Sequence, residues 1–217
     1  FQRFKKHPWV NPLITGGERI AYGAKALNEG GWQAIHQLTF PGGALIGDAA
    51  GFLNVPQIKG IHTAIQSGII AAEAAFKQLS LQKPDAPIHL TDYPTQLKQS
   101  WVGKALYQAR NIRPGFRFGL LFGLVNAAFE TYISRGYSPW TLRLPYDDRS
   151  LSKAAEAKPI AYPKPDGIFT FDRLSSVYLT QLFQEADQPC HLKLRDPSRA
   201  ISVNYEKYAS PETRYCP

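Results

Sequence analysis

Residues 41–74 read PGGALIGDAAGFLNVPQIKGIHTAIQSGIIAAEA, and this stretch decides the fold class. The short apolar run 44–47 predicts an interior strand of an α/β layer. A glycine-rich loop follows, and from Ile61 the apolar residues recur at helical spacing, which predicts a helix with one buried face. The residues of that predicted face are Ile61, Ala64, Ile65, Gly68, Ile69, Ala72, Ala75, Phe76 and Leu79.

The loop between the predicted strand and helix has the chemistry of a ligand site. Asp48 would lie at the carboxyl end of the strand, where ligands bind in open α/β sheets, and its carboxylate can accept hydrogen bonds from sugar or ribityl hydroxyls. Gly47 and Gly51 lack the Cβ atom that would hold a flat ligand away, and Gly60 can take unusual dihedrals before the helix. The unpaired N–H groups of the first helical turn suit a ring atom that gains negative charge, as in a reduced flavin. A tight strand-to-helix connection in any α/β protein remains the alternative.

The whole stretch resembles the second FAD-binding motif of glutathione-reductase-type flavoproteins and, more narrowly, the electron-transfer flavoprotein:ubiquinone oxidoreductase family. The similarity continues through FQRFKKHPWVNPLITGGERIAYGAKALNEGGWQ, SWVGKALYQARNIRPGF, SRGYSPWTL, YPKPDGIFTFDRLSSVYLT, DQPCHLKLRDP and PETRYCP. The resemblance implies an α/β chain with three parts: a partial glutathione-reductase-type FAD-binding fold, a quinone- and membrane-contacting segment, and the start of a ferredoxin-like iron-sulfur domain.

The resemblance also implies which residues bind FAD. Asp48 is expected to bind FAD hydroxyls, and Asn54 with the backbone of residues 60–63 is expected to bind the isoalloxazine and ribityl groups. Asn54 has an alternative role, because its side chain can close the loop by an Asx turn. The full predicted cofactor set is Gly47, Asp48, Ala49, Gly51, Asn54, Pro56, Gly60, Ile61, His62 and Thr63. No Ser-His-Asp or paired-carboxylate arrangement stands out, so hydrolysis is disfavoured and no catalytic side chain is predicted.

Two cysteines have different expected roles. In the resembled family a [4Fe-4S] cluster is held by four cysteines, and Cys216 matches the first of them. Because a cubane cluster needs four ligands, the remaining ligands are expected beyond residue 217. Cys190 matches no ligand and is expected to be a small core residue. The G-x-G-x-x-G loop that binds the FAD pyrophosphate does not occur in the sequence, which indicates a piece of a longer protein.

The formal net charge of +8 is compatible with nucleic acid, anionic lipid or an acidic protein as partner. No basic helix or aromatic-basic recognition motif stands out, so we expect no nucleic-acid partner. Basic residues gather in two clusters, of which the second precedes an apolar segment. The first cluster is Arg3, Lys5, Lys6 and His7, and the second is Arg110, Arg113 and Arg117.

Residues 118–129 carry no charge. As a helix they would be about 18 Å long, well short of the roughly 30 Å hydrocarbon core of a bilayer, so they cannot span it. The segment is predicted either to lie in one membrane interface or to form a buried core helix or hairpin, and Gly115, Gly119 and Gly123 favour close packing in both cases. The interface alternative places Arg110, Arg113 and Arg117 at lipid phosphates, and Tyr132, Tyr137 and Trp140 at headgroup depth.

The resemblance favours the membrane interface. It implies peripheral, monotopic attachment to a bacterial cytoplasmic membrane or a mitochondrial inner membrane, where the enzyme reaches ubiquinone. Residues 146–166 are predicted to be a linker. Short strands are predicted at 168–171 and 191–195, and a helical turn within 173–182.

Four segments follow from this reasoning. Residues 1–38 would end a quinone-binding region, 39–81 form the second FAD motif, 82–145 face membrane and quinone, and 146–217 contain the linker and the truncated start of the cluster domain. The implied function is electron transfer from reduced electron-transfer flavoprotein to ubiquinone through FAD and a [4Fe-4S] cluster, with the fragment inactive alone. Two alternatives stay open: an FAD-dependent reductase or monooxygenase of the geranylgeranyl-reductase-like group, and a non-enzymatic peripheral membrane-binding module.

Overall fold

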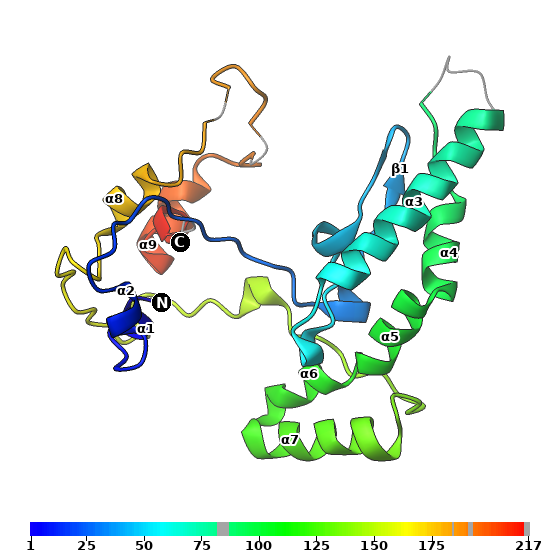
Figure 1. The fold of residues 1–217 in the computed structure, drawn as a ribbon, viewed down its shortest axis with the longest axis horizontal. Coiled ribbons are helices and arrows are strands. Elements are labelled where there is room, and N and C mark those ends of the chain that lie inside the picture. The colour runs from blue at the N-terminus through cyan, green and yellow to red at the C-terminus, as the bar shows by residue number, and fades with distance from the viewer. Residues whose placement is uncertain (82–86, 184, 191–192, 215–217) are drawn as a thin grey trace. The chain divides into compact units, whose positions relative to one another are not determined.

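The computed structural model describes residues 1–81, 87–183, 185–190 and 193–214. They form two compact units, Ala26–Ser150 and a second unit made of Phe1–Lys25 with Leu151–Pro217. Most of the regular structure is helical (Figure 1). In the first unit the elements are η1 (Gly31–Ala34), β1 (Thr39–Phe40), β2 (Gly43–Ala44), η2 (Gly47–Ala50), η3 (Val55–Gln57), α3 (Ile61–Leu81), α4 (Asp92–Gln99), α5 (Trp101–Ala109), α6 (Ile112–Gly115), η4 (Phe116–Phe118), α7 (Leu120–Ala128), η5 (Phe129–Ile133) and η6 (Asp147–Arg149).

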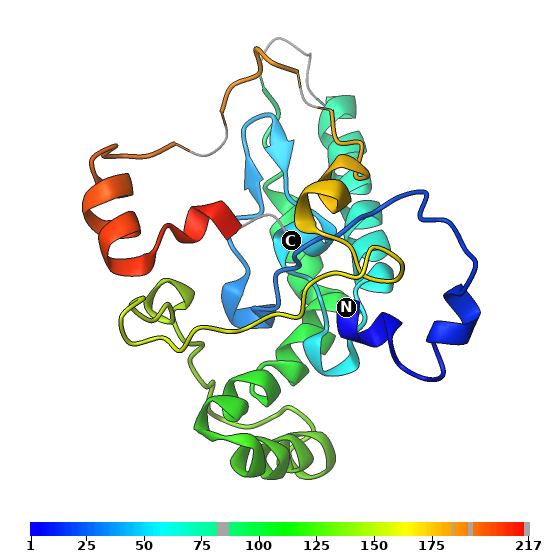
Figure 2. The same ribbon diagram turned by 90° about the vertical axis from the view of Figure 1, so that its left-hand side faces the viewer.

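The sheet is much smaller than an α/β layer. Strands β1 and β2 pair antiparallel with Thr39 opposite Ala44, and in both ribbon views this hairpin lies beside α3 (Figure 1 and Figure 2). The prediction of an interior strand at 44–47 is wrong, because β2 ends at Ala44 and η2 begins at Gly47. An interior strand needs a neighbour on each side, and within the described residues β2 has only β1.

Helix α3 begins at Ile61, as the sequence predicts, but it buries a different face. Its buried residues are Thr63, Ser67, Ile70, Ala71 and Ala74. The three apolar ones, Ile70, Ala71 and Ala74, pack with Leu38, Ala50, Phe52, Tyr93, Leu97, Val102 and Leu106 in the core of this unit. Most of the face predicted to be buried is exposed instead, with Ile65 at 61% and Phe76 at 75%. Its smallest residues, Ala64, Gly68 and Ala75, are half-buried. The uncovered apolar stripe therefore lies opposite the side that packs on α4 and α5.

A helical hairpin, residues 112–133, extends from the end of α5, and we call it the hook (Figure 1). Gly119 makes the turn before α7 with a φ of 102°, a conformation that favours glycine. The two arms pack closely, since a Cβ atom added at Gly123 would lie 2.3 Å from the ring of Phe116. The exposed apolar residues of the hook are Phe116, Phe118, Leu120, Leu121, Phe122, Leu124, Val125, Tyr132 and Ile133. A hairpin is thus present, but in the described chain its apolar side chains are not a buried core.

The second unit contains α1 (Gln2–Lys5), α2 (Asn11–Ile14), α8 (Arg173–Tyr178), η7 (Ala200–Tyr205), α9 (Glu206–Tyr208) and η8 (Pro211–Arg214). Lys6 pairs with Asp166 at 2.9 Å and links the two parts of the unit. The carboxylate of Asp166 also accepts the N–H groups of residues 168–170, which are therefore a turn and not the predicted strand. The predicted helical turn is confirmed as α8, while Lys193–Arg195 are not in a strand and residues 191–192 lie outside the described part. Cys190 is exposed, so its assignment to the core is wrong.

Candidate functional site

The glycine loop after β2 is a compact turn held by its own backbone. The N–H of Gly51 donates to the carbonyl of Asp48 at 3.0 Å, and the N–H of Phe52 donates to the carbonyl of Gly47 at 3.2 Å. Gly51 adopts a left-handed conformation with a φ of 81°, and a Cβ there would lie 3.0 Å from the side chain of Asn28. The turn needs glycine at this position for both reasons.

Side chains from α3 attach the loop to the first turns of the helix. The hydroxyl of Thr63 lies 2.6 Å from the carbonyl oxygen of Phe52 and 2.7 Å from that of Gly60, so these two acceptors share its proton. The hydroxyl of Ser67 accepts the N–H of Gly47 at 2.9 Å. Thr63 and Ser67 are fully buried. The structure therefore brings the loop residues 47–51 against residues 60–67, as a binding motif built from both requires.

Tyr93 of α4 supports the same loop from behind. Its hydroxyl donates to the carbonyl of Leu45 at 3.0 Å. Burial of the ring raises the pKa of Tyr93 to about 12, so the phenol stays protonated and remains a donor over the physiological pH range. This support was not apparent from the sequence.

Asn54 is the best candidate for a polar contact to a ligand. Its side chain is 4% exposed, and among the described residues its Oδ1 atom has no hydrogen-bond partner. Its backbone is fully used, with N–H and carbonyl paired to Lys59. The turn at η3 closes by backbone bonding from Gln57 to the Asn54 carbonyl at 3.1 Å, so the alternative Asx-turn role is wrong. A buried amide oxygen without a partner is costly, and a donor on a bound ring would satisfy it.

The other predicted residues lie around this position. Asp48 is half-buried and Ala49 is exposed in η2, while Pro56 is exposed in η3. Gly60 precedes α3 with ordinary dihedrals, and the positive φ falls on Ile58 at 54°. Ile61, His62 and Thr63 make the first turn of α3, whose N–H groups have no partner within the helix.

The imidazole of His62 stacks on the indole of Trp101, with ring centroids 5.4 Å apart. The residues thus fit a flavin through a buried oxygen that has no partner in the described part of the chain, the first-turn N–H groups of a helix, and a glycine turn. Cys216 lies outside the described residues.

Arg110 at the base of the hook is buried, which contradicts its predicted place at lipid phosphates. It is 3% exposed. Its guanidinium donates to the carbonyl of Ser138 at 2.6 Å, to that of Trp140 at 3.2 Å and to Thr141 Oγ1 at 3.0 Å. Further bonds run to the carbonyls of Tyr107 and Gly136. With its donors used in this way, Arg110 clamps residues 136–141 against the end of α5.

Glu130 forms a second buried polar centre in the hook. It is 1% exposed, and its carboxylate accepts from Asn111 Nδ2 at 3.1 Å, Ser138 Oγ at 2.8 Å and Ser134 Oγ at 2.7 Å. Asn111 also accepts the N–H of Leu142 at 2.8 Å. The sequence signal for this centre is the single acidic residue that ends the uncharged run, and it was missed.

A groove of about 850 Å³ adjoins the hook between residues 27–36 and 141–147. Arg113 and Arg143 line it together with Asn28, Glu29 and Gln33. Arg113 and Glu29 form an ion pair of 3.3 Å at the rim. Arg117 does not line the groove, but its guanidinium donates to the carbonyl of Arg143, a residue that does, at 3.5 Å.

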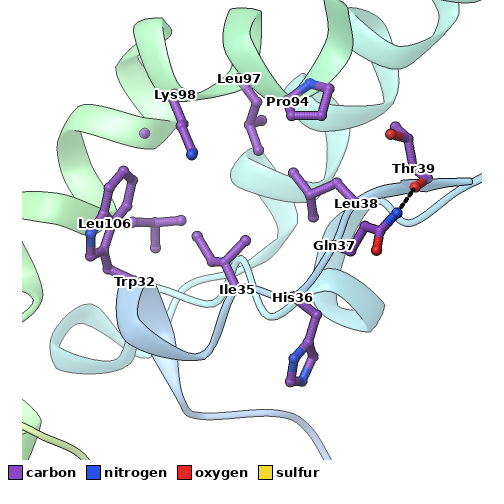
Figure 3. Close-up of a pocket in the computed structure, with 11 residues that line it drawn as sticks. Trp32, Ile35, His36, Gln37, Leu38, Thr39, Pro94, Leu97, Lys98 and Leu106 are labelled. Atoms are coloured by element: carbon purple, nitrogen blue, oxygen red, sulfur yellow. Dashed lines mark hydrogen bonds between the residues drawn. The ribbon is translucent and has the colours of Figure 1, made fainter. Parts of the chain in front are cut away.

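A separate apolar pocket of about 350 Å³ lies between η1 and helices α4 and α5 (Figure 3). Trp32, Ile35, Leu38, Leu97 and Leu106 surround it, and the side chain of Lys98 points toward it. None of the predicted cofactor residues lines this pocket. It is therefore a feature distinct from the glycine-loop site.

Comparisons with known proteins find a family model for one end of the chain and relatives for its whole length. Residues 167–217 match the family model described as electron transfer flavoprotein-ubiquinone oxidoreductase, 4Fe-4S. The whole chain is 52% identical over 223 residues to a protein of Rattus norvegicus and 51% identical to one of Homo sapiens, and it covers 36% of each. It is 48% identical over 218 residues to a protein of Arabidopsis thaliana, of which it covers 34%.

The matched model describes a 4Fe-4S domain of an oxidoreductase, and the match is to residues 167–217. All three relatives are named mitochondrial electron transfer flavoprotein-ubiquinone oxidoreductase. The chain is similar over its whole length to a part of these enzymes, which confirms the resemblance stated from the sequence. It spans about a third of the length of the relatives it matches. Among the residues described, no helix combines the length and the apolar character needed to cross a membrane.

Proposed function

We propose that this chain is part of an enzyme that passes electrons from reduced electron-transfer flavoprotein to ubiquinone, with FAD and a [4Fe-4S] cluster as its redox centres. The observation that carries the proposal is the glycine loop tied to α3, in a chain similar throughout to proteins of that name. The match of residues 167–217 to the cluster-domain model favours this function over a reductase or monooxygenase without a cluster and over a non-enzymatic membrane module.

The residues would divide the work of holding FAD. Asp48 accepts hydrogen bonds from its hydroxyls, and Asn54 Oδ1 accepts from a ring or ribityl donor. The first-turn N–H groups of Ile61, His62 and Thr63 would stabilise the part of the ring that gains negative charge. Thr63 and Ser67 keep loop and helix in register by their own hydrogen bonds. FAD, when bound, supplies the electron-transfer chemistry.

Cys216 would provide the first cluster ligand, with the other three beyond residue 217. A chain that holds one ligand in four cannot assemble the cluster, so we expect it to be inactive alone. The proposed division by function remains 1–38, 39–81, 82–145 and 146–217. It differs from the two compact units because it follows cofactor chemistry and not packing.

The hook would be the part that meets the membrane. Its exposed apolar side chains, among them Leu121 at 78% and Leu120 at 71%, suit an interfacial position. Ubiquinone stays in the bilayer, so an enzyme that reduces it must bring its redox centre to the membrane face. Peripheral attachment to a mitochondrial inner membrane or a bacterial cytoplasmic membrane follows.

The test is the spectrum of the full-length protein in detergent. We expect oxidised-flavin absorption bands that bleach with dithionite, together with a new EPR signal of a reduced cluster. Flavin without a cluster signal would move the protein to the reductase or monooxygenase class. Loss of both chromophores would leave only membrane binding.

The Asn54 contact has a separate test. An Asn54→Ala substitution removes one neutral hydrogen bond, worth about 0.5–1.5 kcal/mol, and should weaken FAD binding by roughly two- to twelvefold. The matched control is Asn28→Ala, whose side chain contacts the same glycine turn but is not assigned to the flavin. Equal FAD affinities for the Asn54 variant and the control would remove Asn54 from the site.

A further inference from the structure

We propose that the groove at the base of the hook binds the phosphate of an anionic phospholipid headgroup, with Arg113, Arg117 and Arg143 as its ligands. The inference rests on the proposed membrane contact and adds a defined headgroup site to it. Arg110 is bonded internally, whereas Arg113 and Arg143 line the groove and Arg117 bonds the backbone of Arg143 beside it.

The position of Arg117 is the first argument. It belongs to η4, directly before the turn into α7, and its guanidinium lies 5.0 Å from the centroid of the exposed Phe118 ring. Phe118 in turn packs edge-on against Phe122 of α7. Arg117 is thus the charged group at the border of the apolar surface. When the apolar side chains enter the acyl region, a charge at this border reaches the depth of the phosphates.

The second argument is the arrangement of charge in the groove. Arg113 is exposed and already holds one carboxylate, that of Glu29, in a weak surface ion pair. In the part of the chain with described side chains, Arg117 and Arg143 have no carboxylate within ion-pair distance. Guanidinium groups bind phosphate oxygens through paired N–H donors. Two guanidiniums that have no carboxylate partner in the described part of the chain, beside a third, therefore favour an anion.

The size of the groove and its place beside the hook favour a lipid headgroup as the source of the phosphate. The groove measures about 850 Å³, which is the space of a small-molecule site. Arg113 of the hook lines it, so a headgroup bound there would lie beside the hook, whose apolar side chains could receive the acyl chains. An anionic phospholipid meets both the charge and the apolar surface. A zwitterionic lipid would bring its own cation to the arginines and lose part of the attraction.

The experiment is flotation of the full-length protein with two kinds of vesicle: phosphatidylcholine alone, and equal parts of phosphatidylcholine and phosphatidylglycerol. The test variant is Arg117→Gln with Arg143→Gln. The matched control is Lys98→Gln with Lys104→Gln, which removes the same charge from exposed positions of α4 and α5. Far-UV circular dichroism with heating checks that both doubles fold as the unmodified protein does.

We expect the unmodified protein to prefer the anionic vesicles. Since each basic residue near an anionic surface contributes roughly fivefold in affinity, the arginine double variant should lose roughly 25-fold, to the level of neutral vesicles. The lysine double variant should keep most of the preference. Equal losses in the two doubles would mean diffuse attraction without a site and would overturn the inference.

Other outcomes distinguish a failure of the headgroup site from a failure of the proposed membrane contact. Equal binding to both vesicles by the unmodified protein would remove the headgroup site and leave the proposed membrane contact standing. No binding to either vesicle would remove the membrane contact, and the site with it. Inorganic phosphate that displaces the protein from anionic vesicles at millimolar concentration, with the same dependence on Arg117 and Arg143, would assign the groove to a soluble anion and overturn the lipid assignment.

Discussion

Replacement of Arg110 by alanine tests whether its guanidinium is a structural clamp. The side chain is 3% exposed and makes five hydrogen bonds to the carbonyls of residues 107, 136, 138 and 140 and to the Thr141 hydroxyl. It also lies 3.8 Å from the Tyr107 ring centroid. Buried carbonyls that lose a charged donor cost about 1–3 kcal/mol each, and water entering the space left behind recovers part of this. We expect Arg110→Ala to lower the free energy of unfolding by about 3–5 kcal/mol.

The assay is equilibrium urea unfolding followed by tryptophan fluorescence, because Trp140 accepts a hydrogen bond from Arg110 and stacks on Phe129. Arg113→Ala is the matched control. Arg113 is exposed and forms a surface ion pair, so its loss should cost at most about 1 kcal/mol. A cost below about 1 kcal/mol for Arg110→Ala, or an equal cost for both variants, would refute the clamp.

Three further predictions concern the loop, the hook and the pH dependence of stability. Thr63→Val keeps the shape of the side chain and removes the hydroxyl that ties Phe52 to α3, so urea unfolding should show a loss of about 1–2 kcal/mol; no loss would contradict the tie. Gly123→Ala places a Cβ 2.3 Å from Phe116 and should cost about 1–3 kcal/mol by overpacking, whereas Gly68→Ala meets its nearest atom only at 3.9 Å and should stabilise α3 by about 0.5–1 kcal/mol. The same sign for both glycine variants in thermal unfolding would speak against the packing. The pKa of Tyr93 is raised from 10.0 to about 12, so the stabilising contribution of its neutral phenol is complete below pH 10.0 and is lost as the pH rises toward 12. The free energy of unfolding, measured with urea across this range, should therefore fall more steeply for the unmodified protein than for Tyr93→Phe. An equal fall for the two proteins would contradict this prediction.

The start of α3 could be predicted from the sequence, but its buried face could not. Apolar residues occur almost all around this helix, so their spacing does not single out one side. Thr63 and Ser67 determine which face of α3 is buried, since their hydroxyls form hydrogen bonds to the glycine loop and must face it. A hydrogen bond from a polar side chain to a neighbouring loop cannot be predicted from the spacing of apolar residues.

The structure of the hook, too, could be predicted only in part from the sequence. Its uncharged composition predicted a short apolar segment correctly, and the glycine spacing correctly indicated close packing at Gly123. Charge counting placed Arg110 with Arg113 and Arg117, although only the first is buried. The difference arises from carbonyls at residues 136–140, which become acceptors only when the chain folds back on α5. That return depends on tertiary structure.

The cofactor site was predicted as a set of positions by the resemblance, and the structure adds how they are held. The loop and the helix start come together as expected, and Asn54 has a buried oxygen without a partner in the described part of the chain. The strand before the loop was overestimated because its sequence is apolar, yet the described residues supply it with a single antiparallel neighbour. Strand prediction from a short apolar run assumes a sheet around it.

The most direct test of the proposed function is an electron-transfer assay with the full-length protein. Reduced electron-transfer flavoprotein is supplied as donor and a short-chain ubiquinone as acceptor, and reduction of the quinone is followed by its absorbance. We predict quinone reduction that requires both the flavoprotein and the full-length protein. Reoxidation of a bound flavin without quinone reduction, or reduction that proceeds equally without the flavoprotein, would contradict the account.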